Sequence, residues 1–147
     1  MRKFEKITAY QKETFDLPKR STSHSAGYDL ASVEEVLIQP GEIKKVPTGL
    51  KVSMQDNEVM LVFPRSSLGL KKQLMLANNV GVIDQDYYNS PGNEGHIMIP
   101  IYNFGQTPQT IEKYERIAQG IFITYLKTDD DETVDDKRIS GFGSTDK

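Results

Sequence analysis

The sequence predicts an all-β fold of the compact barrel or jelly-roll kind. Its apolar residues come in short runs separated by glycine and proline, with little of the sustained period of a helix. Turn signals such as Pro40-Gly41 and Thr48-Gly49 recur at nearly regular spacing along the chain. Many short strands joined by such turns are typical of closed or two-sheet β architectures.

Eleven strands and one short helix are expected in chain order. The strands are predicted at 5–10, 28–31, 35–38, 43–47, 50–54, 59–63, 75–78, 81–84, 96–103, 109–111 and 117–125. The helix is predicted at 67–73, with Ser66 as its N-cap, because a hydroxyl there can accept from the first unpaired amides. Open strand edges invite further chains, so we expect oligomers.

Composition indicates a single intracellular domain. A chain of 147 residues can bury roughly 68 to 70% of the surface that it exposes when unfolded. It has no cysteine, which excludes disulfides and thiolate metal sites and fits a reducing compartment. His24 and His96 lie far apart among small and polar residues, so we expect surface residues rather than zinc ligands.

No segment resembles a signal peptide or a membrane span. The first ten residues lack an apolar centre, and the longest apolar run, 59–63, is much too short to cross a bilayer. We therefore expect a cytoplasmic protein that does not enter a membrane.

An acidic segment divides the expected domain from the end of the chain. Residues 129–136 contain six carboxylates, which repel one another and cannot bury apolar surface. We expect a β domain at 1–128, a flexible tether at 129–137 and a mobile arm at 138–147. Removing these six carboxylates from the formal charge of −3 leaves +3 on the remainder. A modestly basic body suits a small anionic ligand better than a nucleic acid.

Two segments in the first half carry charged groups in unusual places. SAGYDLAS, residues 25–32, puts Asp29 in an apolar strand, where it must face either a cation or solvent. PRSSLGL, residues 64–70, puts Arg65 beside two hydroxyls at the start of a helix. That arrangement can bind phosphate, and it is equally consistent with a capped helix that carries a surface arginine.

The segment 78–98 offers the richest chemistry. Asp84 follows two apolar strand residues and, as an ionised carboxylate, can take a proton from water. Gly81 lets a ligand approach the backbone, and the ring of Tyr87 can support a sugar. A decorated hairpin whose polar residues serve only the turn remains the alternative.

Two later segments complete the set. RIAQGIF, residues 116–122, places Arg116 and Gln119 in an apolar strand, so Gln119 should bond either neighbouring backbone or a ligand water. The arm supplies groups suited to an anion and a flat ring. These are Arg138, Gly141, Phe142, Gly143, Ser144 and Thr145.

Taken together, five motifs in this order resemble those of the trimeric deoxyuridine triphosphate nucleotidohydrolases, the dUTPases. They read AGYDLAS, PRSSLGL, NNVGVIDQDY, RIAQGIF and RISGFGST. The resemblance implies a β-clip, or distorted jelly roll, assembled as a homotrimer with three sites at subunit interfaces. It also implies hydrolysis of dUTP to dUMP and pyrophosphate, with Mg²⁺ on the triphosphate.

The resemblance also implies roles for individual residues. Asp84 would activate the attacking water, Tyr87 would lie beneath the deoxyribose, and Asp29 would orient the metal or the sugar-phosphate region through water. Uracil would be read by Asn78, Val82, Ile83 and Met98, and the phosphates and their water by Arg65, Ser66, Ser67 and Gln119. From a neighbouring subunit, Phe142 would cover uracil while Arg138, Gly143, Ser144 and Thr145 would close over the nucleotide.

Two departures from the family pattern stand out. Asn89 occupies the place of the usual glycine, which is delayed to Gly95 by an insertion of six residues, 89–94. The arm is one residue shorter before Phe142, so either Lys137 or Arg138 would meet the terminal phosphate.

Two other functions are alternatives for this sequence. The dCTP deaminases share the fold, but their catalytic glutamate aligns with Pro100, which cannot transfer protons. A regulatory protein that uses the nucleotide site as a switch, with a partner on the inserted hairpin or the N-terminal segment, is the other alternative.

Overall fold

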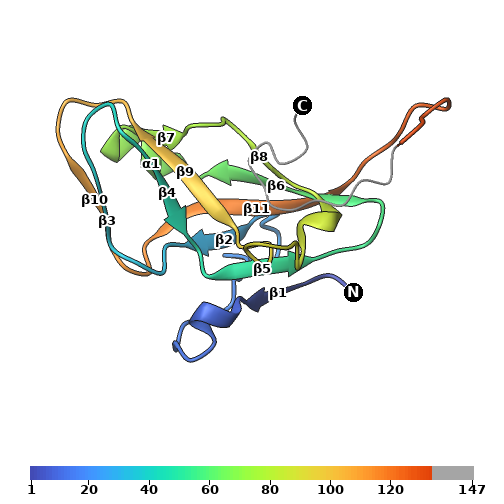
Figure 1. Cartoon of the computed structure of the whole chain (residues 1–147). Helices are drawn as coiled ribbons and strands as arrows, with labels where there is room; N and C mark the ends of the chain where they lie inside the picture. Colours follow the sequence, from blue (N-terminus) through green and yellow to red (C-terminus); the bar gives the residue numbers. More distant parts are fainter. Residues whose placement is uncertain (134–147) are drawn as a thin grey trace.

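Residues 1–133 are described in the computed structural model of the chain (Figure 1), and the predicted arm lies outside them. The described part contains eleven strands, one α-helix and two 3-10 turns. The strands are β1 Lys3–Lys6, β2 Tyr28–Ala31, β3 Val36–Ile38, β4 Ile43–Pro47, β5 Leu50–Ser53, β6 Glu58–Pro64, β7 Leu74–Leu76, β8 Gly81–Ile83, β9 Met98–Asn103, β10 Gln109–Ile111 and β11 Arg116–Thr124. The helical elements are η1 Thr8–Tyr10, α1 Ser66–Lys72 and η2 Gln85–Tyr87.

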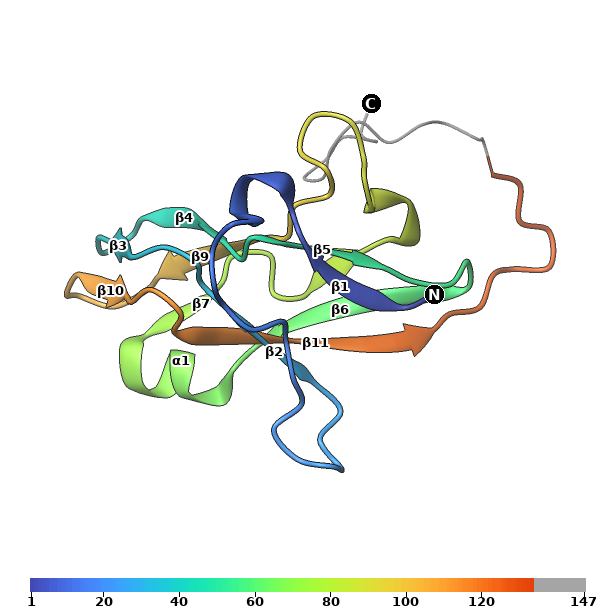
Figure 2. The same cartoon turned by 90° about the horizontal axis from the view of Figure 1, so that it is seen from below.

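The strands form four antiparallel sheets. The largest has the order β2-β11-β6-β8, and a second has the order β4-β9-β7. Two strand pairs, β1-β5 and β10-β3, complete the set. Figure 2 shows α1 and the loop that follows η2 on opposite sides of the molecule. Strand β6 leads into α1 and β8 leads into η2, so the β2-β11-β6-β8 sheet separates the predicted site residues near α1 from those near η2.

A single apolar core lies between the sheets. Strand β9 alternates half-buried and buried residues, which directs Ile99 and Ile101 into the core. Asn103, the last residue of this strand, is also fully buried. Its amide donates to the carbonyl oxygens of Ile38 and Thr107, both at 2.9 Å, so this buried polar group is satisfied.

The predicted all-β class with one short helix is confirmed. Strands β2, β4 and β10 match the predicted limits residue for residue. The predicted strand 5–10 is wrong in its second half, because β1 ends at Lys6 and η1 follows. Ile7 donates to the carbonyl of Gly49 as the chain turns away from β5.

The predicted N-cap of the helix is also wrong. Arg65, not Ser66, holds the cap position, in extended conformation and without a side-chain capping bond. Its amide still donates to the carbonyl of Ile117 at 3.2 Å, as in a strand ladder, and Leu68 then closes the first helical turn onto its carbonyl. No helix in residues 1–133 is long and apolar enough to cross a membrane.

Candidate active site

Asp29 lies between two arginines that come from distant parts of the chain. Its carboxylate is 3.4 Å from a terminal nitrogen of Arg116 and 4.0 Å from Nε of Arg65. The hydroxyl of Ser21 donates to it at 2.9 Å. The aspartate side chain is only 17% exposed, so of the two readings of the sequence the structure supports the cation-facing one. We call Ser21, Asp29, Arg65 and Arg116 the Asp29 cluster.

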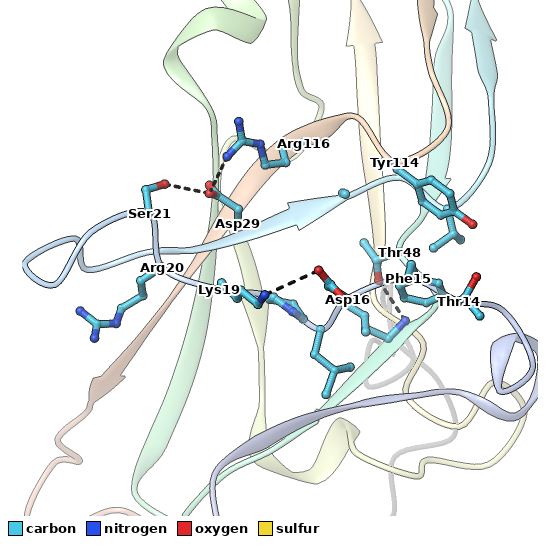
Figure 3. Close-up of a pocket in the computed structure, with 15 residues that line it drawn as sticks. Thr14, Phe15, Asp16, Lys19, Arg20, Ser21, Asp29, Thr48, Tyr114 and Arg116 are labelled. Carbon is cyan, nitrogen blue, oxygen red and sulfur yellow. Dashed lines mark hydrogen bonds and ion pairs between the residues drawn. The ribbon is translucent and has the colours of Figure 1, made fainter.

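The geometry of strand β11 explains how this cluster forms. The pairing of β11 with β2 shifts between Arg116 and Ala118, as at a β-bulge. A bulge re-aims side chains, and here Arg116 points toward Asp29 (Figure 3). No sequence pattern assigns a role to Arg116 or singles out Ser21, because their contacts with Asp29 form only in the folded chain.

Gln119 lies beside the cluster on the same sheet. It is opposite Asp29 in β2 and opposite Phe63 in β6. Its amide nitrogen donates to the carbonyl of Pro64 at 3.5 Å, which is the bond to neighbouring backbone that the sequence allowed. A Cβ at Gly27 would lie 2.4 Å from the Gln119 side-chain oxygen, so a larger residue here would require the Gln119 side chain to shift.

The predicted phosphate residues are thus brought together. Arg65 precedes the helix, and Ser66 and Ser67 form its first turn, Ser66 exposed and Ser67 half-buried. Together with Asp29 and Gln119 they occupy the β2-β11-β6 end of the sheet.

Asp84 lies at the other edge of this sheet. It follows β8 directly, holds the cap position of η2 in extended conformation, and is half-buried. Val82, two residues earlier, is 58% exposed, and Ile83 is half-buried. Asn78 lies in the exposed turn before β8, and Met98 is half-buried at the start of β9, opposite Pro47. Strand β8 has one partner in the described sheet, β6, and therefore presents an open backbone edge.

Tyr87 is held by buried hydrogen bonds. Its side chain is 4% exposed within this chain. Its hydroxyl donates to the carbonyl of His96 at 2.5 Å and accepts from the Asn93 amide at 2.9 Å. We call residues 88–95, which contain Asn93 and the insertion, the Tyr87 loop.

His96 is a structural residue rather than the surface residue that the sequence predicted. Its Nε2 accepts the backbone amide of Gly49 at 2.9 Å, a bond that requires the neutral ring. Burial lowers the pKa of its imidazole, while the carboxylates of Glu34 and Glu94 act in the opposite direction. Spacing along the chain gives no sign of this contact, which joins residues 47 positions apart.

A cavity of about 500 Å³ opens beside the Asp29 cluster (Figure 3). Segment 14–21 contributes much of its lining, together with Thr48, Tyr114 and Arg116. Among the predicted site residues within 1–133, Asp29 alone lines it. No group of three or more histidine, aspartate or glutamate side chains within 1–133 is placed to hold a metal ion. The predicted residues Arg138, Phe142, Gly143, Ser144 and Thr145 lie outside the described part of the chain.

Comparison with known proteins places this geometry in context. The dUTPase family model matches residues 13–146. The deoxyuridine 5'-triphosphate nucleotidohydrolase of Lactococcus lactis is 51% identical over 146 residues, covering 99% of this chain and 97% of the relative. The enzyme of the same name from Chromobacterium violaceum is 39% identical over 137 residues, covering 88% of this chain and 87% of the relative.

Solved structures agree with these sequence relatives. The crystal structure of dUTPase from Streptococcus mutans has a TM-score of 0.82 and 50% identity, covering 86% of this chain and 98% of that one. A dUTPase mutant from phage phi11 of S. aureus has a TM-score of 0.73 at 21% identity, covering 92% and 97%, and shares the fold. These neighbours confirm the predicted distorted jelly-roll architecture.

Proposed function

Because the chain belongs to the dUTPase family, we propose that it hydrolyses dUTP to dUMP and pyrophosphate, with Asp84 activating the attacking water. The family makes it an enzyme, a dUTP diphosphatase. One observation carries the mechanism: Asp84 directly follows the edge strand β8, so a carboxylate that can act as general base lies next to an open strand edge that can pair with the nucleobase. The cytoplasmic location stays a prediction.

Asp84 takes a proton from water as the water oxygen attacks the α-phosphorus. The bond between that phosphorus and the oxygen that bridges to the β-phosphate then breaks, and pyrophosphate leaves with the electron pair. A positioned general base of this kind typically contributes 10² to 10⁴ in rate.

Uracil is read at β8 and the sugar at Tyr87. Edge-strand backbone of Val82 and Ile83, with Asn78 and Met98 at the start of β9, pairs with the polar edge of uracil in a slot too narrow for the methyl group of thymine. The ring of Tyr87 lies beneath the deoxyribose and excludes a 2′-hydroxyl. Its buried bonds support this role because they fix the ring in one position.

The triphosphate binds at the Asp29 cluster. Arg65 presents a planar fork to phosphate oxygens, Ser66 and Ser67 donate from the first helical turn, and Gln119 holds a phosphate-bound water. Asp29 contacts both arginines directly, so it orients them toward the phosphates.

Magnesium fits this arrangement as an ion carried by the substrate. Mg²⁺ keeps several waters and binds through substrate phosphates with one or two carboxylates, and Asp29, already between two guanidiniums, could contact it only through water. When bound to the triphosphate, the ion would supply neutralisation of the charge that develops on the pyrophosphate.

The distance between the two groups supports a composite site in a homotrimer. Asp29 lies on β2 and Asp84 directly follows β8, and these two outer strands of the four-stranded sheet are three strand spacings or roughly 14 Å apart. Through Gln119, Asp29 is level with Phe63 of β6, whereas Ile83 pairs with Met60 of the same strand. Asp84 lies one residue beyond Ile83, so the two carboxylates are also displaced by about 13 Å along the strand direction. We infer that Asp84 of one subunit works with the Asp29 cluster of another, and that the arm of a neighbouring subunit closes the site.

A nucleotide panel with magnesium tests the proposal. We expect pyrophosphate from dUTP far faster than from dTTP, dCTP or UTP. Comparable turnover of dTTP would contradict the uracil slot. Ammonia from dCTP would favour a deaminase, although Pro100 lies in β9 paired with Lys45 and offers no group for that reaction.

A further inference from the structure

Asn93, in the insertion of the Tyr87 loop, uses both ends of its side-chain amide. The nitrogen donates to the hydroxyl of Tyr87 at 2.9 Å. The oxygen accepts from the backbone amide of Gly95 at 3.0 Å and from the hydroxyl of Ser90 at 3.3 Å. One side chain therefore fixes the path of the loop and bonds the hydroxyl of the tyrosine whose ring the proposed function places under the sugar.

The hydroxyl of Tyr87 is constrained from two directions. Its proton is committed to the carbonyl of His96, so the contact with Asn93 must use an oxygen lone pair and needs a donor. An amide nitrogen supplies that donor, whereas a carboxylate in the same place does not. The phenol is thus held by one accepted and one donated bond, and it is nearly fully buried.

The outer side of the loop is tied to the N-terminal part of the chain. The Glu94 carboxylate accepts from the amide of Thr8 at 3.2 Å and from its hydroxyl at 3.1 Å. Lys51 lies 3.5 Å from Glu94 and donates to Asn89 at 2.6 Å. Figure 2 shows the loop and η1 on the same side of the molecule. These bonds hold the loop in place and keep Asn93 within hydrogen-bonding distance of Tyr87.

We propose that Asn93 is a positioning residue that holds the ring of Tyr87 against the deoxyribose and thereby sets the preference for dUTP over UTP. The inference rests on the proposed function of Tyr87. A tilt of the ring opens space for a 2′-hydroxyl and weakens support for the deoxyribose, so the loss of Asn93 lowers the ratio of kcat/KM for dUTP to that for UTP. Loss of one buried hydrogen bond corresponds to a change of about tenfold in that ratio.

The test is a double-mutant cycle. Asn93→Ala is measured alone and in the Tyr87→Phe background, with kcat/KM for dUTP and UTP as the readout. We expect about a tenfold fall in the ratio in the parent, and no further fall once Tyr87→Phe has removed the hydroxyl. An equal fall in both backgrounds, or none in the parent, would overturn the proposal.

Asn93→Asp is the matched variant. It keeps an oxygen for the amide of Gly95, so the loop retains that bond, but it lacks the donor for Tyr87. We expect its ratio to fall as in Asn93→Ala, and an unchanged ratio would show that the loop contact alone matters. If the unmodified protein showed no preference for dUTP over UTP, the proposed function would fail. If it preferred dUTP and the Asn93 variants showed the same preference, only the role of Asn93 would be contradicted.

Discussion

Asp29 contacts two charged side chains, whereas the hydroxyl of Tyr87 is hydrogen-bonded to two neutral groups, His96 and Asn93. Arg116 pairs with Asp29 while its own side chain is 55% exposed, and the Arg65 contact, at 4.0 Å, is at the limit of an ion pair. Tyr87 is buried, with bonds of 2.5 and 2.9 Å to neutral partners. Exposed ion pairs contribute little to stability, so the arginines can exchange these pairs for contacts with phosphate at little cost to the fold. Buried neutral bonds fix geometry, which suits discrimination between similar sugars.

The largest effect is expected at Asp84, beside the Tyr87 end. Asp84→Asn keeps the shape but cannot take a proton, so turnover of dUTP should fall by about 10² to 10⁴. Nucleotide binding, measured by calorimetry with a nonhydrolysable analogue, should largely survive. Near-normal turnover in the folded variant would remove Asp84 from the mechanism.

The next largest effect is expected from removing a charge of the Asp29 cluster. Arg65→Ala should lower kcat/KM for dUTP by about 10- to 100-fold, since a charged hydrogen bond contributes about 1.5 to 3 kcal/mol. Arg65→Lys keeps the charge but not the fork, and should lose less. Both variants should unfold at nearly the parent temperature. A large loss of stability with unchanged kinetics would mean that the arginine serves the fold.

A third prediction concerns the backbone of the Tyr87 loop. Gly95 has φ +83, and an added Cβ would lie 2.3 Å from the carbonyl oxygen of Tyr87. Gly41 has a similar φ of +79 with nothing within 4 Å, so Gly41→Ala is the matched control. Gly95→Ala should destabilise the protein by more than about 1 kcal/mol beyond the control, measured by urea unfolding. Equal losses would show that the loop relaxes around the added methyl group.

The smallest effect is the pH dependence from His96. The pKa of its imidazole is lowered in the folded state from an ordinary 6.5. As the pH falls, the unfolded chain therefore binds a proton at this residue before the folded chain does. The stabilisation is therefore present above about pH 6.5 and lost as the pH falls through the lowered folded pKa, at most about 1.4 kcal/mol per pH unit. Urea unfolding from pH 8 to 5 should show a steeper loss for the parent than for His96→Gln. Parallel curves would contradict this origin.

Local patterns predicted the strands well because glycine and proline mark the turns between them. The sequence missed features set by distant contacts. Strand β1 stops where Ile7 bonds Gly49, and Arg65 takes the cap because its amide still pairs with Ile117. Nothing near these residues in the sequence signals either contact.

The site shows the same division. Motif residues such as Asp29 and Arg65 were identified, and the structure places them together. The role of Arg116 does not follow from the sequence, because the bulge that turns it toward Asp29 depends on pairing between β11 and β2. Asn93 carried no signal, since its partner Tyr87 is reached only through the folded loop.

The central claim is that charge holds the triphosphate while neutral buried bonds select the sugar. It is tested most directly by measuring kcat/KM for dUTP and UTP between about 0.05 and 0.5 M salt, at saturating magnesium. Salt screens exposed charges over a few ångströms at high concentration, so both values should fall in parallel and their ratio should stay constant. A ratio that falls with salt, or values that do not respond to salt, would contradict this division.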